Sequence, residues 1–434
     1  MANDFVTNEI VLFDKILEKF EPNNITARQV DKFKPEMQSF ERSSLQVFKP
    51  VPYISRSKRG LTLVDADYKN TTQLAVPSTL NNNDDEDNSN IHSVAFTMNA
   101  FELNDPLQLN RKAESAVQAI AAIIDNLTAR EVANKGSIVI ADTVSGGLSK
   151  YEQYTAAEVA LINRDVPLMR PRTIILNPND YNLVSANLAQ RDAVPVGVSL
   201  TAFERSMIPR ISTFDSFKTN FMPTLELAAG SGFLVNGNQS FQPTATDSNG
   251  NNVDNRTMTL NVDTGSGTEK VGDCFTIVGI NALSAIHKND FGKLQTFRIT
   301  EVNTAGTIWT ITPPIITNNS AATITPGQAE EEYANCSDEA NDNAMISFIN
   351  TVDAQVNIFF DNSAVELIHG SLSKLELNGS GVASSVRATE SGIELIFARE
   401  TELNDFSTKY RLTAWFNPNV LIPEMCGILI GKQT

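Results

Sequence analysis

Residues 105–136 read DPLQLNRKAESAVQAIAAIIDNLTAREVANKG, and this stretch predicts one long amphipathic helix. Asp105 suits the N-cap, Pro106 the first helical position and Gly136 the position just past the end. At about 1.5 Å per residue the helix spans roughly 45 Å. We interpret it as a core helix that serves as a scaffold, rather than as a cofactor-binding stripe. Its small alanines would let a sheet pack closely against it. Apolar residues at spacings of three and four form its stripe: Leu109, Ala113, Ala116, Val117, Ile120, Ile123, Ile124 and Leu127.

The whole-chain composition is that of a soluble globular protein. The chain has 434 residues, enough for about two or three domains, and its formal net charge is −17. Such an acidic chain repels phosphate, which argues against general nucleic-acid binding. Three widely spaced cysteines, Cys274, Cys336 and Cys426, predict neither a disulfide framework nor a zinc site. We find no signal peptide and no apolar run that could span a bilayer, so we expect a cytosolic setting and no membrane.

The N-terminal residues 3–20 predict a short amphipathic helix, with apolar positions at Val6, Ile10, Phe13, Leu17 and Phe20. Such a helix docks either on its own domain or on a partner. The sequence leaves both alternatives open.

Residues 44–98 are interpreted as a long extended excursion. Residues 45–48 and 61–64 are strand-like, and between them lies a basic tip that comprises Arg56, Lys58 and Arg59. Residues 81–90, NNNDDEDNSN, form an acidic low-complexity segment that predicts a solvated loop. A strand pair that carries a basic tip indicates an arm reaching a neighbouring subunit.

The rest of the chain indicates one domain interrupted by another. Residues 136–225 mix short strands and helices, whereas residues 226–344 lose helical periodicity and show period-two strands with turns between them. The mixed pattern returns after that stretch. A barrel or sandwich inserted into a parent domain explains this order.

No constellation in the sequence supports catalysis. His92, His287 and His369 lack partners at triad or metal-ligand spacing. The C-terminal Gly427–Gly431 pair has three intervening residues where a phosphate loop needs four. Residues 247–254 resemble a calcium loop in composition, but the glycine position is wrong and no bidentate Glu follows. We therefore expect no enzyme activity, no cofactor and no bound metal.

Seven segments, taken in order and spacing, carry a family resemblance: residues 40–44 (FERSS), 176–181 (LNPNDY), 253–256 (VDNR), 270–273 (KVGD) with Gly279, 333–335 (YAN), 354–360 (AQVNIFF) and 411–416 (RLTAWF). On these segments the chain resembles the major capsid (coat) protein of short-tailed Salmonella-type (Lederbergvirus-like) double-stranded DNA bacteriophages. That group uses the Hong Kong phage-type coat fold with an inserted β-barrel. The resemblance covers nearly the whole chain.

The resemblance implies an α+β fold in which the long helix is the spine of a peripheral domain. It further implies this layout: N-terminal arm 1–40, extended loop 41–98, spine helix 99–135, axial domain 136–225 and 345–384, inserted all-β barrel domain 226–344, and C-terminal peripheral strands 385–434.

The implied function is to build an icosahedral shell from hexamers and pentamers. A scaffolding protein and a portal protein would be partners, and the procapsid would expand while enclosing double-stranded DNA without sequence-specific contacts. The subunit would reside in the virion capsid after assembly in the host bacterial cytoplasm. The alternative is an encapsulin-like or other self-assembling shell.

Three sets of residues are candidate contacts. In the inserted domain the loop 242–256 would meet its mate between capsomers, with Asp247, Asp254 and Arg256 as contact or loop-anchoring residues. The tip Arg56, Lys58 and Arg59 would dock on an acidic patch of a neighbour. Phe13, Leu17 and Phe20 of the arm would contact scaffolding protein or a neighbour.

Overall fold

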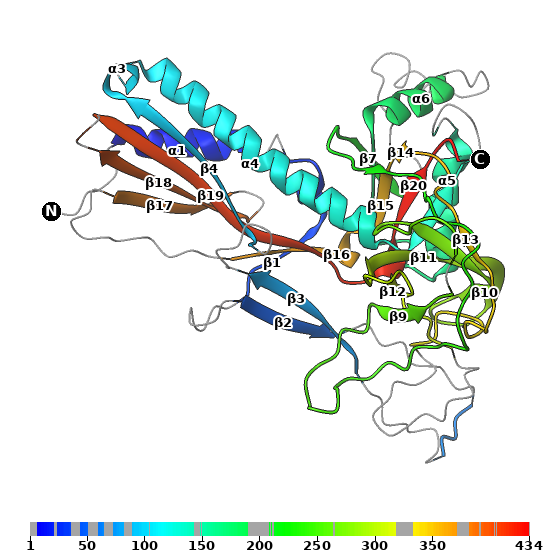
Figure 1. The fold of residues 1–434 in the computed structure, drawn as a ribbon. Coiled ribbons are helices and arrows are strands. Elements are labelled where there is room, and N and C mark those ends of the chain that lie inside the picture. Colours follow the sequence, from blue (N-terminus) through cyan, green and yellow to red (C-terminus); the bar gives the residue numbers. More distant parts are fainter. Residues whose placement is uncertain are drawn as a thin grey trace. The chain divides into compact units, whose positions relative to one another are not determined.

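The computed structural model describes residues 7–20, 24–35, 44–50, 60–64, 73–81, 89–103, 105–142, 148, 150–189, 208, 210, 212–263, 265–317, 333–370, 382–389, 392–402, 404 and 406–433. The fold is mixed α and β (Figure 1). Two compact units are each built from three chain segments: unit 1 from Met1–Val47, Ser78–Ala129 and Glu366–Asn419, and unit 2 from Phe48–Pro77, Arg130–Val365 and Val420–Thr434. Among the described helices none is long and apolar enough to cross a membrane.

The predicted long helix is confirmed as α4, Pro106–Lys135. Asp105 caps it, because its Oδ1 accepts the Leu107 N–H at 3.0 Å. At the other end the Gly136 N–H returns to the Val132 carbonyl at 2.9 Å, as expected just past a helix. The stripe is largely buried, and the fully buried members include Ala113, Ala116, Val117, Ile120 and Ile124.

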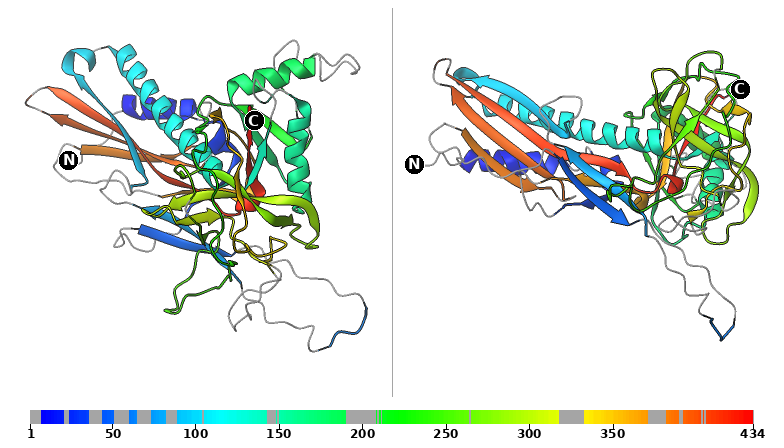
Figure 2. Two further views of the ribbon diagram at one scale, coloured as in Figure 1. Left: turned by 45° about the vertical axis from the view of Figure 1, so that its right-hand side comes forward. Right: turned by 60° about the horizontal axis from the view of Figure 1, so that its bottom comes forward.

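In unit 1 a six-stranded sheet lies along α4, as Figures 1 and 2 both show. Its order is β1-β16-β19-β18-β17. In addition β4 pairs with Ser407–Trp415 of the long strand β19, on the edge opposite to β18. The Lys112 Nζ reaches the Thr97 carbonyl at 3.2 Å and links α4 to β4. The strands are β1 (Asp31–Phe33), β4 (Ile91–Asn99), β16 (Val365–His369), β17 (Val382–Ala388), β18 (Glu394–Glu402) and β19 (Ser407–Val420). Three more helices belong here: α1 (Thr7–Phe20), α2 (Thr26–Gln29) and α3 (Ala100–Leu103).

The extended excursion has a different strand pair from the predicted one. β2 (Ser44–Pro50) pairs with β3 (Ala75–Asn81), not with residues 61–64, which are not a strand. The two segments differ in the solvent exposure of their side chains. Leu61 and Leu63 are exposed, so residues 61–64 have no buried face, whereas β3 alternates between half-buried and buried positions. At the base of the acidic segment, the Asn81 N–H donates to the Asn90 Oδ1 at 2.7 Å.

Unit 2 contains a mixed sheet of order β5-β20-β15-β6-β7, with parallel pairs at both edges and antiparallel pairs in the centre. Helices α5 (Tyr151–Asn163) and α6 (Pro178–Ala189) contribute Tyr154, Leu161 and Val184 to its core. The mixture of short strands and helices predicted for residues 136–225 is found here, with β5 and β6 as short buried strands. The bounds are β5 (Ile138–Ala141), β6 (Arg172–Leu176), β7 (Phe214–Lys218), β15 (Asn357–Asp361) and β20 (Cys426–Ile430).

Residues 226–344 are all β where described, but their strands do not pair as a closed barrel. They form an open antiparallel sheet of order β13-β10-β11-β12-β9 around Trp309, Phe275 and Phe297. Its edge strand β13 begins at Ile346, just after the predicted range 226–344. The bounds are β9 (Met258–Asn261), β10 (Cys274–Leu283), β11 (Asp290–Val302), β12 (Ile308–Thr312) and β13 (Ile346–Phe348). A separate two-stranded sheet consists of β8 (Thr224–Leu225) and β14 (Ala354–Gln355).

Both edges of this open sheet are reached by one segment, residues 233–236. The Ile346 N–H donates to the Phe233 carbonyl at 3.1 Å, and the Asn236 N–H donates to the Asn261 carbonyl at 3.1 Å. Isolated bridges join Val235 to Val262 and Leu234 to Met345. The segment therefore satisfies backbone groups on the β9 side and on the β13 side.

Candidate assembly interfaces

The tip of the loop 242–256 is shaped by Asp247. Its Oδ1 accepts the N–H groups of Asn249 and Asn251, both at 2.8 Å, and its Oδ2 accepts the Asn251 side-chain amide at 3.2 Å. The Asn251 N–H and the other loop donors hold the pKa of this carboxyl below its ordinary value. Asp247 thus maintains the turn, and a contact role would add to that structural one.

The base of the same loop is fixed by Arg256. Its guanidinium forms a two-point ion pair with Asp254, Nε to Oδ1 at 2.9 Å and Nη2 to Oδ2 at 2.8 Å. Nη1 also donates to the Val420 carbonyl at 2.8 Å, and Nη2 donates to the Pro77 carbonyl at 3.2 Å. Arg256 and Asp254 therefore act within the subunit, which supports the loop-anchoring alternative among their predicted roles.

The predicted basic tip, Arg56, Lys58 and Arg59, lies outside the described residues. Its described neighbours at 60–64 are exposed, with Leu61 and Leu63 facing solvent.

The apolar face of α1 docks on its own unit. Phe13 stacks on Phe397 of β18, with ring centroids 5.7 Å apart, and Phe20 is fully buried. Leu17 is half-buried. In this conformation the two phenylalanines are not available to a partner, which favours own-domain docking over partner docking for this face.

A carboxylate in the spine helix holds the chain that follows α1. Asp125 is fully buried, and its two oxygens accept the N–H groups of Ile25 at 2.7 Å and Ala27 at 3.0 Å. Burial raises the pKa of Asp125 to about 6, although the backbone donors oppose that shift. This contact joins the segment that follows α1 to α4 within unit 1.

The sheet β13-β10-β11-β12-β9 is joined to the C-terminal end of α4 through β11. The buried Arg298 donates from Nη2 to the Ala133 carbonyl in the last turn of α4, and from Nη1 to the Cys274 Sγ. Two residues earlier, the Thr296 hydroxyl donates to the Ser137 carbonyl and accepts the Val139 N–H. A cation at a helix C-terminus is favoured by the helix dipole, so Arg298 both caps α4 and links β11 to it.

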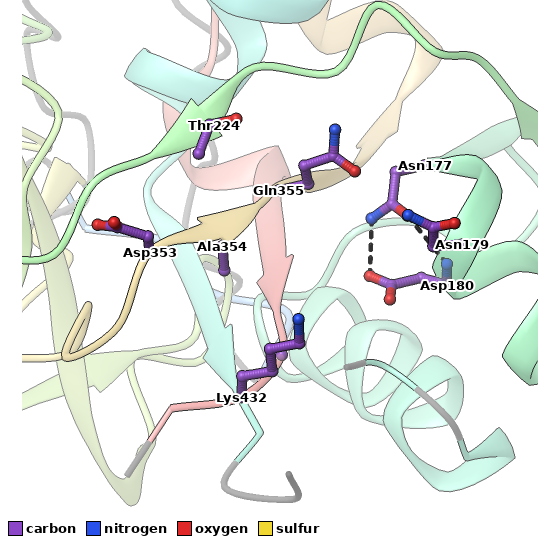
Figure 3. A pocket seen from close by; sticks show the side chains of 9 residues that line it. Asn177, Asn179, Asp180, Thr224, Asp353, Ala354, Gln355 and Lys432 are labelled. Carbon is purple, nitrogen blue, oxygen red and sulfur yellow. Dashed lines mark hydrogen bonds between the residues drawn. The ribbon is translucent and has the colours of Figure 1, made fainter. Parts of the chain in front are cut away.

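A polar cavity of about 340 Å³ opens beside the N-terminus of α6 (Figure 3). At its edge the Asp180 Oδ2 accepts the side-chain amides of Asn177 and Asn357, each at 2.7 Å. The Asn177 Oδ1 accepts the Asp180 N–H at 2.9 Å, which completes a capping interaction across the first turn. This network ties β6, α6 and β15 together.

The sequence analysis missed Asp125, Arg298 and the Asn177–Asp180–Asn357 network. Asp125 had a usable signal, because an acidic residue beside Ile124 and four positions after Ala121 interrupts the buried side of the helix. For Arg298 the sequence carries no such signal, since its partner Ala133 lies 165 residues away in the chain.

Comparison with known proteins gives the family. Residues 1–431 match the family described as P22 coat protein, gene protein 5. Among solved structures, the chain is similar to one titled Mycobacterium phage Che8, with TM-score 0.41, 9% identity and coverage of 94% of this chain and 90% of that one. It is also similar to the capsid of the cyanophage P-SCSP1u, with TM-score 0.43, 11% identity and coverage of 95% and 89%. The CUS-3 coat protein I-domain matches 28% of this chain and 96% of its own length at 33% identity, with TM-score 0.23. Because the family match extends over essentially the whole length, this chain belongs to the P22 coat protein family and is a major capsid protein, a structural subunit of an icosahedral phage head.

Proposed function

We propose that this subunit co-assembles with a scaffolding protein around a portal to form a procapsid, which expands as double-stranded DNA is packaged. The single observation that carries the proposal is the family match over residues 1–431. Within that family we assign the chain to the short-tailed Salmonella-type group, on the motif order set out above. Assembly would take place in the host bacterial cytoplasm.

The domain layout belongs to the same proposal. Residues 226–344 and the adjoining β13 would be a guest β-barrel, with residues 233–236 closing the gap between β9 and β13. The backbone hydrogen bonds from this segment to both sheet edges support that assignment. Residues 136–225 and 345–384 would be the axial domain, and the sheet of unit 1 with α4 would be the peripheral domain.

The contact residues remain a proposal as well. The loop 242–256 would reach its mate between capsomers, held in shape by Asp247 and anchored by Arg256. The tip Arg56, Lys58 and Arg59 would dock on an acidic patch of the neighbour. The arm would recruit scaffolding protein, and because Phe13 and Phe20 are buried, their exposure would require α1 to leave unit 1.

Electron microscopy of the purified full-length protein, with and without a co-expressed scaffolding protein, tests the proposal. We expect uniform closed shells with scaffold, and few or aberrant shells without it. Equally uniform shells in the absence of scaffold would contradict scaffold-assisted assembly and favour the encapsulin-like alternative.

Charge reversal at the basic tip tests the extended-loop contact separately. The variant Arg56→Glu/Lys58→Glu/Arg59→Glu should leave subunit folding unchanged by circular dichroism but reduce the yield of shells. Normal shells from this triple variant would rule out the contact, without bearing on the role of the scaffold.

A further inference from the structure

A second cavity in unit 2, of about 320 Å³, lies beside the edge strand β5 and the first half of β11. Its walls are mostly apolar. Ile140 of β5 and Ala160 of α5 line it together with Phe291 and Leu294 of β11, and these last two side chains are each 41% exposed. Small-molecule sites have volumes of about 300–1,000 Å³ and are walled mainly by apolar groups. The cavity therefore has room for one small ligand.

The opening is built from two strand edges and small side chains. In the described part of the chain β5 pairs only with β20, and residues 290–294 pair only with β10, since β12 pairs further along β11. The Val139 N–H donates to the Thr296 hydroxyl at 3.2 Å, so the two edges meet there through a side chain instead of a strand ladder. Ala156 and Ala160 lie one turn apart on α5, and their small side chains leave the space beside them unfilled.

The charge of the cavity is opposite to that of the whole chain. Of the described residues that line it, Arg164 and Lys293 are cationic and none is acidic, although the chain has 51 acidic and 34 basic residues. Lys293 is exposed, and the described residues give it no ion-pair partner. Arg164 donates to two neutral groups, the Gln295 Oε1 at 3.0 Å and the Ser137 hydroxyl at 3.4 Å. The cavity thus combines apolar walls with cations that can receive an anionic group.

One negative charge is already placed near Arg164. Burial lowers the pKa of the Arg164 guanidinium, and the charge of the Glu424 carboxylate opposes that shift. The Asn335 side-chain amide donates to the Glu424 Oε1 at 2.6 Å and holds this carboxylate in place. With Glu424 set against Arg164, the cation left unbalanced is Lys293. A ligand with one negative charge matches this balance, whereas a doubly charged group would be repelled more strongly by an acidic chain.

We propose that this cavity binds a small amphipathic monoanion of the fatty-acid class, with its carboxylate at Lys293 and its alkyl chain against the apolar walls. Cationic side chains bind carboxylates through charge-assisted hydrogen bonds, and burial of the alkyl chain removes apolar surface from water. The bound ligand would contact α5, β5 and β11 together, and it would stabilise the folded subunit because it binds only that state. The site belongs to the single subunit, so the inference does not depend on shell assembly.

Isothermal titration calorimetry of the free full-length subunit with octanoate, well below the concentration at which octanoate forms micelles, tests the proposal. We expect saturable binding of one octanoate per subunit. The uncharged 1-octanol has the same alkyl chain and should bind at least about tenfold more weakly, because it lacks the charge-assisted contact. Absence of saturable octanoate binding would overturn the proposal. Equal affinity for octanol would also overturn it, since the cavity would then be an apolar space without a role for its cations.

Removal of one positive charge tests the position of the carboxylate. Lys293→Gln should weaken octanoate binding by about tenfold, towards the affinity for octanol, and leave octanol binding unchanged. Lys270→Gln is the matched control, because it removes the same charge from an exposed lysine that is paired with Glu226 outside the cavity. This control should leave both affinities unchanged. An equal loss of octanoate affinity in both variants would refute a contact at Lys293, since the effect would then follow from net charge.

Filling or opening the apolar walls tests the position of the alkyl chain. Ala160→Leu should abolish binding of octanoate and of octanol, and it should also abolish the rise in urea midpoint that octanoate causes in the wild type. Circular dichroism checks that this variant is folded. Phe291→Ser changes a side chain that is 41% exposed, so the fold should persist while both affinities fall by about tenfold. Octanoate binding that is unchanged in Phe291→Ser would place the ligand elsewhere and refute the site, without bearing on the proposed assembly.

Discussion

Asp125 is a buried carboxylate in α4, and its protonation should change the free energy of unfolding of the subunit. Burial raises the pKa of Asp125 from 3.8 to about 6 in the folded subunit. Folding therefore takes up a proton at this group between those values, so its favourable contribution is present below pH 3.8 and is lost as pH rises through about 6. Asp125→Asn cannot titrate. The unfolding free energy of the wild type minus that of the variant should fall by about 2–3 kcal/mol from pH 4 to pH 7.

Urea unfolding of the free subunit across that pH range measures the difference. Both proteins share every other titrating group, so their own pH dependences cancel in the subtraction. A difference that stays flat with pH would show that Asp125 is not buried against the N–H groups of Ile25 and Ala27 as described.

Arg256 should matter to the subunit before any shell forms. Its guanidinium satisfies two backbone carbonyls and one carboxylate of its own chain. Arg256→Met should lower the unfolding free energy of the free subunit by about 2–3 kcal/mol, because the carbonyls of Val420 and Pro77 and the Asp254 carboxylate each lose hydrogen bonds from the guanidinium. A residue that acted only between subunits would leave that free energy unchanged and reduce shell yield instead. Measuring both quantities on one variant decides between anchor and contact.

At the scale of elements, β11 holds the C-terminal turn of α4 in place. Arg298 donates to the Ala133 carbonyl, which belongs to the group of helix-end carbonyls without an intrahelical partner. Arg298→Met removes that donor and the favourable charge at the helix end. We expect faster amide hydrogen exchange in the last turn of α4, by about tenfold, with exchange at its centre near Ile120 unchanged.

Arg298→Lys is the matched control for this prediction, since it keeps the charge at the helix end and should restore part of the protection. Exchange that rises evenly along the whole of α4 would indicate general destabilisation of the helix rather than loss of a cap.

Elements governed by local pattern were predictable, and those governed by distant partners were not. The stripe and the end signals of α4 gave its bounds to the residue, and short strands such as β5 and β6 followed from their apolar runs. The predicted pairing of β2 with residues 61–64 was wrong. Strand pairing depends on which segment buries one of its faces, and β3 buries a face whereas residues 61–64 do not. Polar contacts across 100 residues or more, such as Asp125 to Ile25, leave no periodic trace in the sequence.

At the scale of the whole molecule, the acidic charge and the capsid role are compatible for a physical reason. A shell that encloses DNA must let the polymer move during filling, and a lining that bound phosphates tightly would impede that movement. With net charge −17 the subunit has more carboxylates than cations to present.

The same charge predicts how free subunits behave with double-stranded DNA. Fluorescence anisotropy with a labelled duplex at about 0.1 M salt should show no saturable binding at micromolar subunit, because few phosphates can be neutralised and few counterions released. Any weak signal should have a slope of log affinity against log salt close to zero. A basic DNA-binding protein titrated under the same conditions serves as the positive control. Tight binding with a slope of several units would contradict the prediction, and it would mean that a cluster of basic side chains, such as Arg56, Lys58 and Arg59, grips the backbone despite the overall charge.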